Sequence, residues 1–188
     1  MEAYDYRKIK KKDGFSFSYV EIIDLLKAWI AISFAFAIAR GFSLGNLMLS
    51  ASVVGSGFLI HELSHKFFAQ NYGCWSEFRS DDRMLMMALM FSFFGFVFAA
   101  PGAVLISGHL SKKQNGIVSL AGPASNIVMA LLFLPFFRFG SMINSYLALF
   151  NMLPFYPLDG SKVLAWNKII YGVFSAVAVL FVFISSVY

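Results

Sequence analysis

Two histidines and a glutamate stand together in the segment FLIHELSH, at His61, Glu62 and His65. Residues four apart in a helix share a face, so the two imidazoles can reach one metal ion. Glu62, beside the first histidine, can then take a proton from an attacking water molecule. Hydrogen bonding between helices is the alternative role for these groups, but ionisable side chains in an apolar segment are costly and generally functional. The pattern therefore predicts a metal-dependent hydrolytic site.

A catalytic zinc site needs a third protein ligand besides two histidines. The later histidine and acidic residues are Glu77, Asp81, Asp82, His109 and Asp159. The first four stand among polar residues, which predicts solvated loop positions for them. Asp159 instead follows an apolar segment that Pro154 and Pro157 interrupt. Irregular backbone at membrane depth is tolerated where it is buried or lines a cavity, so we predict that Asp159 is the third ligand.

The composition places these residues in a membrane. Hydrophobic residues make up 59% of the 188 and charged residues 13%, whereas an average soluble chain is about 25% charged. With 23 Phe, polar groups could not cover a water-facing surface. A soluble enzyme, a disordered chain and a nucleic-acid binder are excluded, and the sequence predicts an all-α integral membrane protein.

Six apolar stretches follow one another, at residues 20–39, 44–69, 84–100, 116–137, 141–153 and 163–187. A spanning helix needs about 20 mainly apolar residues, and 84–100 is short and stopped by Pro101. We expect a polytopic helical bundle of five or six transmembrane segments that forms one membrane-embedded domain over 1–188. Within it, 1–19 is a basic cytoplasmic tail and 44–162 is the catalytic core.

Basic residues indicate that 84–100 dips into the membrane and returns on the same side. In that arrangement most basic residues share the cytoplasmic side with the tail, and those left outside are Arg40 and Arg138, as the positive-inside rule expects. It also brings His61, His65 and Asp159 to one side, where they can meet at one ion. We therefore expect five spans, a re-entrant segment and a short extended stretch at 101–106, with an ordinary sixth span as the alternative.

Taken together, these motifs resemble those of a known family. The segments HELSH at 61–65 and NMLPFYPLDG at 151–160 are similar to the two metal motifs of the site-2 proteases, which are intramembrane zinc metalloproteases. The segment GPASN at 122–126 resembles the glycine element on the middle core helix of that family. The resemblance covers about 44–162. The chain departs from the family in having neither a PDZ nor a CBS domain and in carrying the extra stretch 84–100.

The resemblance implies one Zn²⁺ per chain, held by His61, His65 and Asp159, with Glu62 as the general base. It implies hydrolysis of peptide bonds within or near the transmembrane segments of membrane-protein substrates. It also places Asn151 near the metal, where it holds the substrate or the oxyanion; capping of backbone freed by the prolines is the alternative.

Two other functions compete with a protease. A non-catalytic metal-binding membrane protein would not need Glu62 as a base, and a small ion transporter would be expected to show repeat symmetry, which this sequence lacks. We expect transmembrane substrates and the lipid bilayer as partners and no nucleic acid. The expected location is the cell membrane, with several passes and a cytoplasmic N-terminus. Gly122, Pro123 and Asn126 are expected to pack helices together.

Overall fold

The computed structural model describes residues 15–97 and 101–187. Most of the basic tail, the last three residues of the predicted re-entrant stretch and Tyr188 lie outside the described residues. The helices are α1 (Tyr19–Ala39), α2 (Leu44–Ser50), a π-helical turn (Ala51–Gly55), α3 (Ser56–Asn71), α4 (Asp82–Ser92), α5 (Lys112–Phe133), α6 (Arg138–Asn151), α7 (Asp159–Trp166) and α8 (Lys168–Val187). Two strands, β1 (Trp75–Ser80) and β2 (Gly102–Ser107), lie between α3 and α5 in the chain.

Polar side chains fix where several helices begin. Ser18 caps α1, and Ser111 caps α5 in a reciprocal arrangement with Gln114, so that backbone N–H groups without a helical partner are satisfied. The Asn167 side chain accepts two N–H groups from the first turn of α8, at 2.9 and 3.1 Å. The apolar stretch predicted over 163–187 is therefore two helices, α7 and α8, rather than one.

Among the described residues, four helical segments are long and apolar enough to cross a membrane: Tyr19–Ala39, Leu44–Asn71, Lys112–Phe133 and Lys168–Val187. They correspond to four of the six predicted stretches, and the chain is a largely helical membrane protein. Helix α6 has 14 residues, which reach about 21 Å at 1.5 Å per residue and fall short of a hydrocarbon core of about 30 Å. The total of five or six spans stays a prediction.

Strands β1 and β2 pair in antiparallel orientation, and all six residues of each strand are paired. Helix α4 lies between the two strands in the chain, and this strand pair is called the hairpin below. The extended stretch predicted at 101–106 is confirmed as β2. The polar loop predicted around Glu77 is wrong, because Glu77 lies in β1. Ser76 and Phe78 are buried while their neighbours are partly exposed, which is the two-residue period of a strand; the charged residues on the other face hid this pattern.

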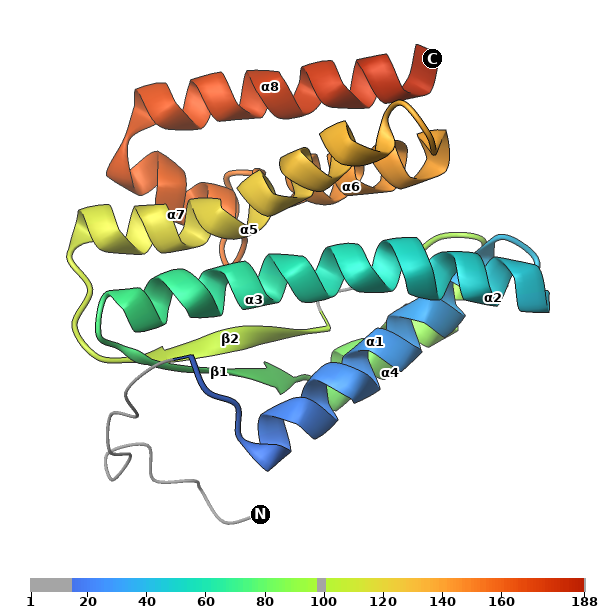
Figure 1. Ribbon diagram of the computed structural model, residues 1–188, viewed down its shortest axis with the longest axis horizontal. Coiled ribbons are helices and arrows are strands. Elements are labelled where there is room, and N and C mark those ends of the chain that lie inside the picture. Colours follow the sequence, from blue (N-terminus) through green and yellow to red (C-terminus); the bar gives the residue numbers. More distant parts are fainter. Residues whose placement is uncertain (1–14, 98–100, 188) are drawn as a thin grey trace.

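Helix α3 lies in the middle of the molecule (Figure 1). Helices α5, α6, α7 and α8 lie above it in that view, and the hairpin, α1 and α4 lie below. A cluster of buried apolar side chains holds the lower layer to α3; its members are Leu25, Ala28, Ile32, Val54, Phe58, Phe78 and Leu85. The hairpin is therefore packed directly against the helix that carries the two histidines.

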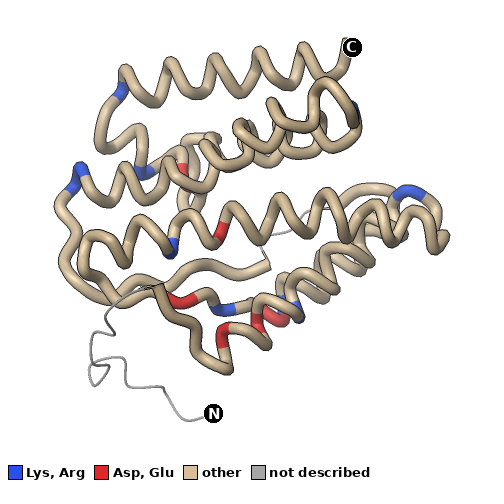
Figure 2. The backbone as a smooth tube through the Cα atoms, in the orientation of Figure 1, with Lys and Arg blue, Asp and Glu red and all other residues tan. Residues whose placement is uncertain are grey.

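The segment between α3 and α5 leaves and returns at one end of the molecule. Helix α3 ends and α5 begins at the left of Figure 1; β1 leads away from that end, α4 packs beside α1, and β2 leads back. Figure 2 shows basic positions at the same end, where α5 and α8 begin, and at the opposite end, where α6 begins. This is the geometry expected of a segment that dips in and returns, and its place in a bilayer stays a prediction.

Candidate metal centre

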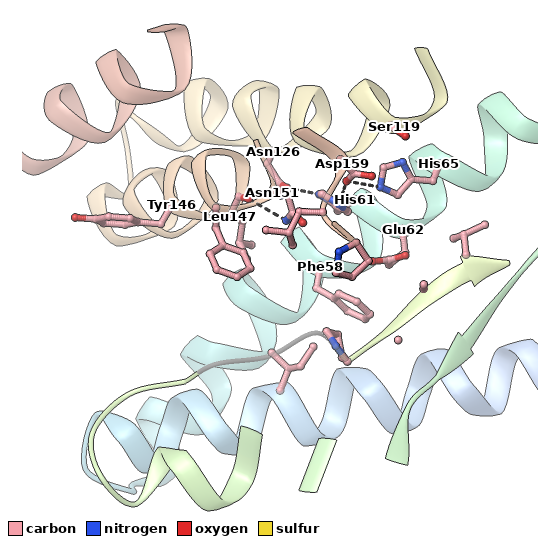
Figure 3. A pocket seen from close by; sticks show the side chains of 18 of the residues that line it. Phe58, His61, Glu62, His65, Ser119, Asn126, Tyr146, Leu147, Asn151 and Asp159 are labelled. Atoms are coloured by element: carbon pink, nitrogen blue, oxygen red, sulfur yellow. Dashed lines mark hydrogen bonds and ion pairs between the residues drawn. The ribbon is translucent and has the colours of Figure 1, made fainter. Parts of the chain in front are cut away.

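The side chains of His61, His65 and Asp159 converge where α3 faces the start of α7 (Figure 3). All three residues are buried, and one ligand atom from each lies within 4.8 Å of the others. Asp159 Oδ2 is 3.4 Å from His61 Nε2 and 3.1 Å from His65 Nε2. Ligand atoms about 2.0–2.1 Å from a tetrahedral zinc ion lie roughly 3.3 Å from one another. The three residues therefore fit one zinc ion.

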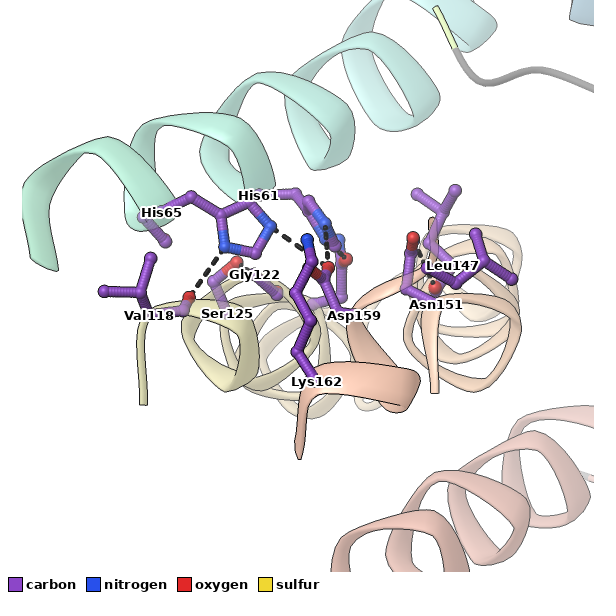
Figure 4. A network of polar contacts seen from close by, with 12 residues as sticks. His61, His65, Val118, Gly122, Ser125, Leu147, Asn151, Asp159 and Lys162 are labelled. Atoms are coloured by element: carbon purple, nitrogen blue, oxygen red, sulfur yellow. Dashed lines mark hydrogen bonds and ion pairs between the residues drawn. The ribbon is translucent and has the colours of Figure 1, made fainter. Parts of the chain in front are cut away.

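Hydrogen bonds at the other ring nitrogen orient each imidazole (Figure 4). His61 Nδ1 lies 2.6 Å from Asn126 Oδ1, and His65 Nδ1 lies 2.7 Å from the Val118 carbonyl oxygen. Both partner atoms are acceptors, so each Nδ1 carries a proton, and in the neutral imidazole each Nε2 presents a lone pair. Two neutral imidazoles and a carboxylate turned toward one point, with each ring held by a hydrogen bond at its other nitrogen, are the arrangement of a metal site.

The Asn126 amide is itself held in one orientation. Its Nδ2 donates to the Gly57 carbonyl at 3.1 Å and to Asn144 Oδ1 at 3.0 Å, while Asn144 Nδ2 donates to the Gly140 carbonyl at 2.9 Å. Because both contacts of Nδ2 are acceptors, Oδ1 must be the atom that faces His61. Asn126 bonds to a neighbouring helix as predicted, but sequence reasoning missed that its partner is a candidate metal ligand.

Gly122 on α5 leaves room for an ion between the two histidines (Figure 4). A Cβ at this position would lie 2.6 Å from His61 Nε2 and would also collide with His65 Nε2. A Cβ atom does not come that close to a non-bonded atom, so any side chain at Gly122 would displace the imidazoles or fill the space of the ion. The glycine therefore serves the candidate site as well as the helix packing predicted for it.

Asp159 reaches the site because the chain turns sharply after α6. Residues 152–158 form irregular turns, and Asp159 is the first residue of α7. Gly160 allows the turn to close, since a Cβ there would lie 2.6 Å from the Leu153 carbonyl oxygen. Lys162, one turn further along α7, places Nζ 3.6 Å from Asp159 Oδ1. This cation helps to balance the carboxylate, and sequence reasoning had assigned Lys162 no role at the site.

A cavity of about 570 Å³ lies beside these residues, between α3, β2, α6 and α7 (Figure 3). Glu62 lines the cavity together with the two histidines and Asp159, whereas side chains such as Phe36 of α1 and Leu147 of α6 make its walls apolar. The Val104 backbone N–H faces the Glu62 carboxylate. The cavity therefore combines apolar walls with a polar centre that contains the candidate base.

Asn151 is the last residue of α6 and lines the same cavity. Its Nδ2 donates to the Leu147 carbonyl at 3.0 Å, within its own helix. This contact is to a carbonyl inside α6 and not to backbone that the prolines free, so both roles considered for Asn151 stay predictions. An amide group carries two N–H bonds, so one remains for another acceptor while Leu147 holds the first.

The other acidic candidates have partners away from the site. Glu77 pairs with Arg79, Asp81 caps α4 through the backbone N–H groups of Arg83 and Met84, and Asp82 pairs with Lys27. His109 is exposed, as predicted. Among the described residues, the structure gathers one group of histidine and acidic side chains that could hold a metal ion, namely the predicted three.

A protein of Methanocaldococcus jannaschii named "putative zinc metalloprotease" is 42% identical to this chain over 174 residues, which cover 85% of the chain and 91% of the relative. The chain belongs to the same family. No family model matches the chain, and no solved structure matches it. The name of this metalloprotease relative agrees with the donor set of the site, because two imidazoles and a carboxylate are typical zinc ligands.

Proposed function

We propose that the protein is an intramembrane zinc endopeptidase of the site-2 protease type. The proposal rests on the convergence of His61, His65 and Asp159 with Glu62 on one cavity. The two histidines and Glu62 lie in a helical segment that is long and apolar enough to cross a membrane. The two Nε2 lone pairs and the carboxylate would hold one zinc ion. Bound zinc lowers the pKa of a water molecule and polarises a carbonyl group.

In this mechanism Glu62 accepts a proton from the attacking water and later delivers it to the leaving amine. Its carboxylate already lines the cavity and faces the Val104 backbone N–H, so it would be in place before a substrate binds. The second N–H of the Asn151 amide would donate to the substrate carbonyl as negative charge develops there. Lys162 would balance the charge of Asp159 without touching the substrate.

The substrates would be transmembrane proteins of the same membrane. A helix satisfies its backbone hydrogen bonds internally, so a segment must unwind before its peptide bond can be attacked. The apolar walls of the cavity match the side chains of such a segment, and its polar centre would receive the exposed backbone. The N-terminus and the ends of the molecule where α5 and α8 begin would face the cytoplasm, because the basic residues gather there.

A reconstituted cleavage assay tests the proposal. The wild-type chain and a Glu62→Gln variant are placed in liposomes with an artificial single-span substrate whose span contains helix-weakening Gly, Asn and Pro residues. Zinc-dependent cleavage inside or beside the span by the wild type, reduced at least a thousandfold in the variant, is the expected result, because the base is lost while the ligands stay. Equal cleavage by both chains would overturn the proposal, and so would cleavage that survives removal of zinc.

A further inference from the structure

A pair of ionisable side chains outside the candidate metal centre is also buried. Glu21 of α1 and Lys66 of α3 form an ion pair whose side chains are both fully buried. The Lys66 ammonium also lies 4.4 Å from the ring centroid of Phe17 and 5.6 Å from that of Phe15. The sequence places Glu21 in a cytoplasmic-side turn of the first span, and its complete burial is a finding of the structure.

A contribution to stability does not by itself explain why this ion pair is buried. The desolvation of two buried charges offsets much of their attraction, and well-packed apolar residues often replace such pairs without loss of stability. Lysine and glutamate side chains are almost never fully buried unless they are paired. The contacts that the pair makes besides its own attraction therefore indicate what it does.

Those contacts join three elements. Glu21 Oε1 accepts the Phe78 backbone N–H of β1 at 3.0 Å, while Oε2 takes the Lys66 ammonium. The carbonyl oxygen of Lys66 accepts the hydroxyl of Ser76, also in β1, at 3.2 Å. Lys66 directly follows the candidate ligand His65. The pair therefore fastens the hairpin to α1 and to the metal helix at the same time.

The hairpin register connects this contact to the candidate site. Phe78 of β1 stands opposite Val104 of β2. The Phe78 N–H is donated to Glu21 and the Val104 N–H faces Glu62, so both point away from the partner strand, as in a non-hydrogen-bonded antiparallel pair. A slip of one residue would turn one of the two N–H groups inward. Two carboxylates on opposite sides of the hairpin thus fix one register and one position.

We propose that Glu21 and Lys66 are positioning residues that hold the β1–β2 hairpin against α3, so that the Val104 N–H meets the Glu62 carboxylate. Glu21 supplies the hydrogen-bond acceptor for β1, and Lys66 supplies the charge that allows a carboxylate to be buried there. Neither residue touches the candidate metal ligands. The consequence for catalysis rests on the proposed function, whereas the placement of the hairpin does not.

Two double variants of the full chain separate positioning from charge. Glu21→Gln with Lys66→Met removes both charges but keeps a carbonyl oxygen for the Phe78 N–H. Glu21→Leu with Lys66→Met removes the same charges and the acceptor too, at similar side-chain volume. Methionine also packs well against the rings of Phe15 and Phe17. The two variants therefore differ in the hydrogen bond that the proposal requires.

Hydrogen–deuterium exchange of the detergent-purified chains is the primary measurement, with zinc content as the second. The Gln/Met variant is expected to keep wild-type protection over 75–80 and 102–107. The Leu/Met variant is expected to exchange there about tenfold faster, the effect of leaving one buried N–H without an acceptor, while α5 exchange and zinc content stay unchanged. In the cleavage assay its kcat would fall at unchanged KM.

Equal hairpin protection in the two variants would overturn the proposal, because the acceptor would then be irrelevant. Loss of protection throughout α1, α3 and α5 in both variants would overturn it as well, because the pair would then serve general stability. Both readouts are independent of proteolysis. A wild-type chain that cleaves nothing would count against the proposed function and leave the exchange result standing.

Discussion

At the scale of single residues, the candidate site depends as much on what surrounds the ligands as on the ligands themselves. Asn126 and the Val118 carbonyl fix the proton on Nδ1 of each histidine, and Gly122 keeps the space in front of both Nε2 atoms empty of side chain. The motif HELSH shows which residues carry the chemistry. It does not show which neighbours orient them, because those lie 53 and more residues away in the sequence.

Replacing Gly122 by alanine is expected to weaken zinc binding strongly while the helices stay intact. The new Cβ would collide with both Nε2 atoms, so we expect zinc affinity to fall about a hundredfold or more, at the upper end of losses caused by residues around metal ligands. Gly172→Ala is the matched control, because a Cβ there meets nothing within 4 Å. Zinc affinity is measured by chelator competition and helix content by circular dichroism. Wild-type affinity in Gly122→Ala would show that the ion does not lie between these histidines.

Asn126→Leu is expected to weaken zinc binding by about 10- to 100-fold, because His61 loses the acceptor that holds its Nδ1–H. The leucine has nearly the same size, but it also removes the bonds that Asn126 donates to Gly57 and Asn144, so helix content is checked by circular dichroism. The same competition titration measures the effect, and Ser125→Ala serves as control because its hydroxyl bonds to the Gly122 carbonyl within its own helix. An affinity unchanged from wild type would remove Asn126 from the site.

At the scale of elements, short irregular segments bring helices from different parts of the chain to one place. The turn at 152–158 delivers Asp159 to α3, and the hairpin delivers the Val104 N–H to Glu62. The sequence predicted the turn from its prolines, and it predicted the extended stretch that forms β2 as the segment that leads back after the re-entrant stretch. It did not predict β1, because four of the six residues of that strand are polar, nor the break at Asn167, because apolar residues stand on both sides of it.

Gly160→Ala is expected to disturb this turn. A Cβ at Gly160 would lie 2.6 Å from the Leu153 carbonyl oxygen, and backbone atoms there cannot move aside as a flexible side chain can. We expect a loss of about 1–3 kcal/mol in unfolding free energy and a zinc affinity reduced at least tenfold as Asp159 shifts. Thermal unfolding in detergent with and without zinc measures both. If the zinc-dependent rise in Tm matched that of Gly172→Ala, the turn would not position the ligand.

At the scale of the whole molecule, the chain folds around α3, with the candidate site open to a cavity between two layers of helices. The basic residues near the starts of α5 and α8 lie at one end, and the start of α6 lies at the other. Helical membrane architecture could be predicted from composition and the two metal motifs from their spacing. The number of spans could not be predicted, because α6 is ambiguous. It has only 14 residues, and Ser141, Asn144 and Ser145 among them are buried polar residues, so its length and composition do not decide whether it crosses the membrane.

Cysteine labelling in intact cells tests the orientation. His109→Cys, just before α5, is expected to resist a membrane-impermeant maleimide until the cells are permeabilised, whereas Phe136→Cys, between α5 and α6, is expected to react from outside; both positions are exposed. The native Cys74 is buried, and burial raises the pKa of its thiol, so little reactive thiolate forms near neutral pH and background labelling is low. Labelling of both positions from outside would contradict a helix α5 that crosses the membrane.

The zinc content of detergent-purified protein tests the central claim most directly, in the wild type, Asp159→Ala and Glu62→Gln. The account predicts about one zinc per chain in the wild type and in Glu62→Gln, because the glutamate is a base and not a ligand. It predicts a loss of at least tenfold in zinc affinity for Asp159→Ala, because one of three ligands is gone. Full zinc occupancy and unchanged affinity in Asp159→Ala would contradict the account, and so would a wild-type chain that binds no zinc.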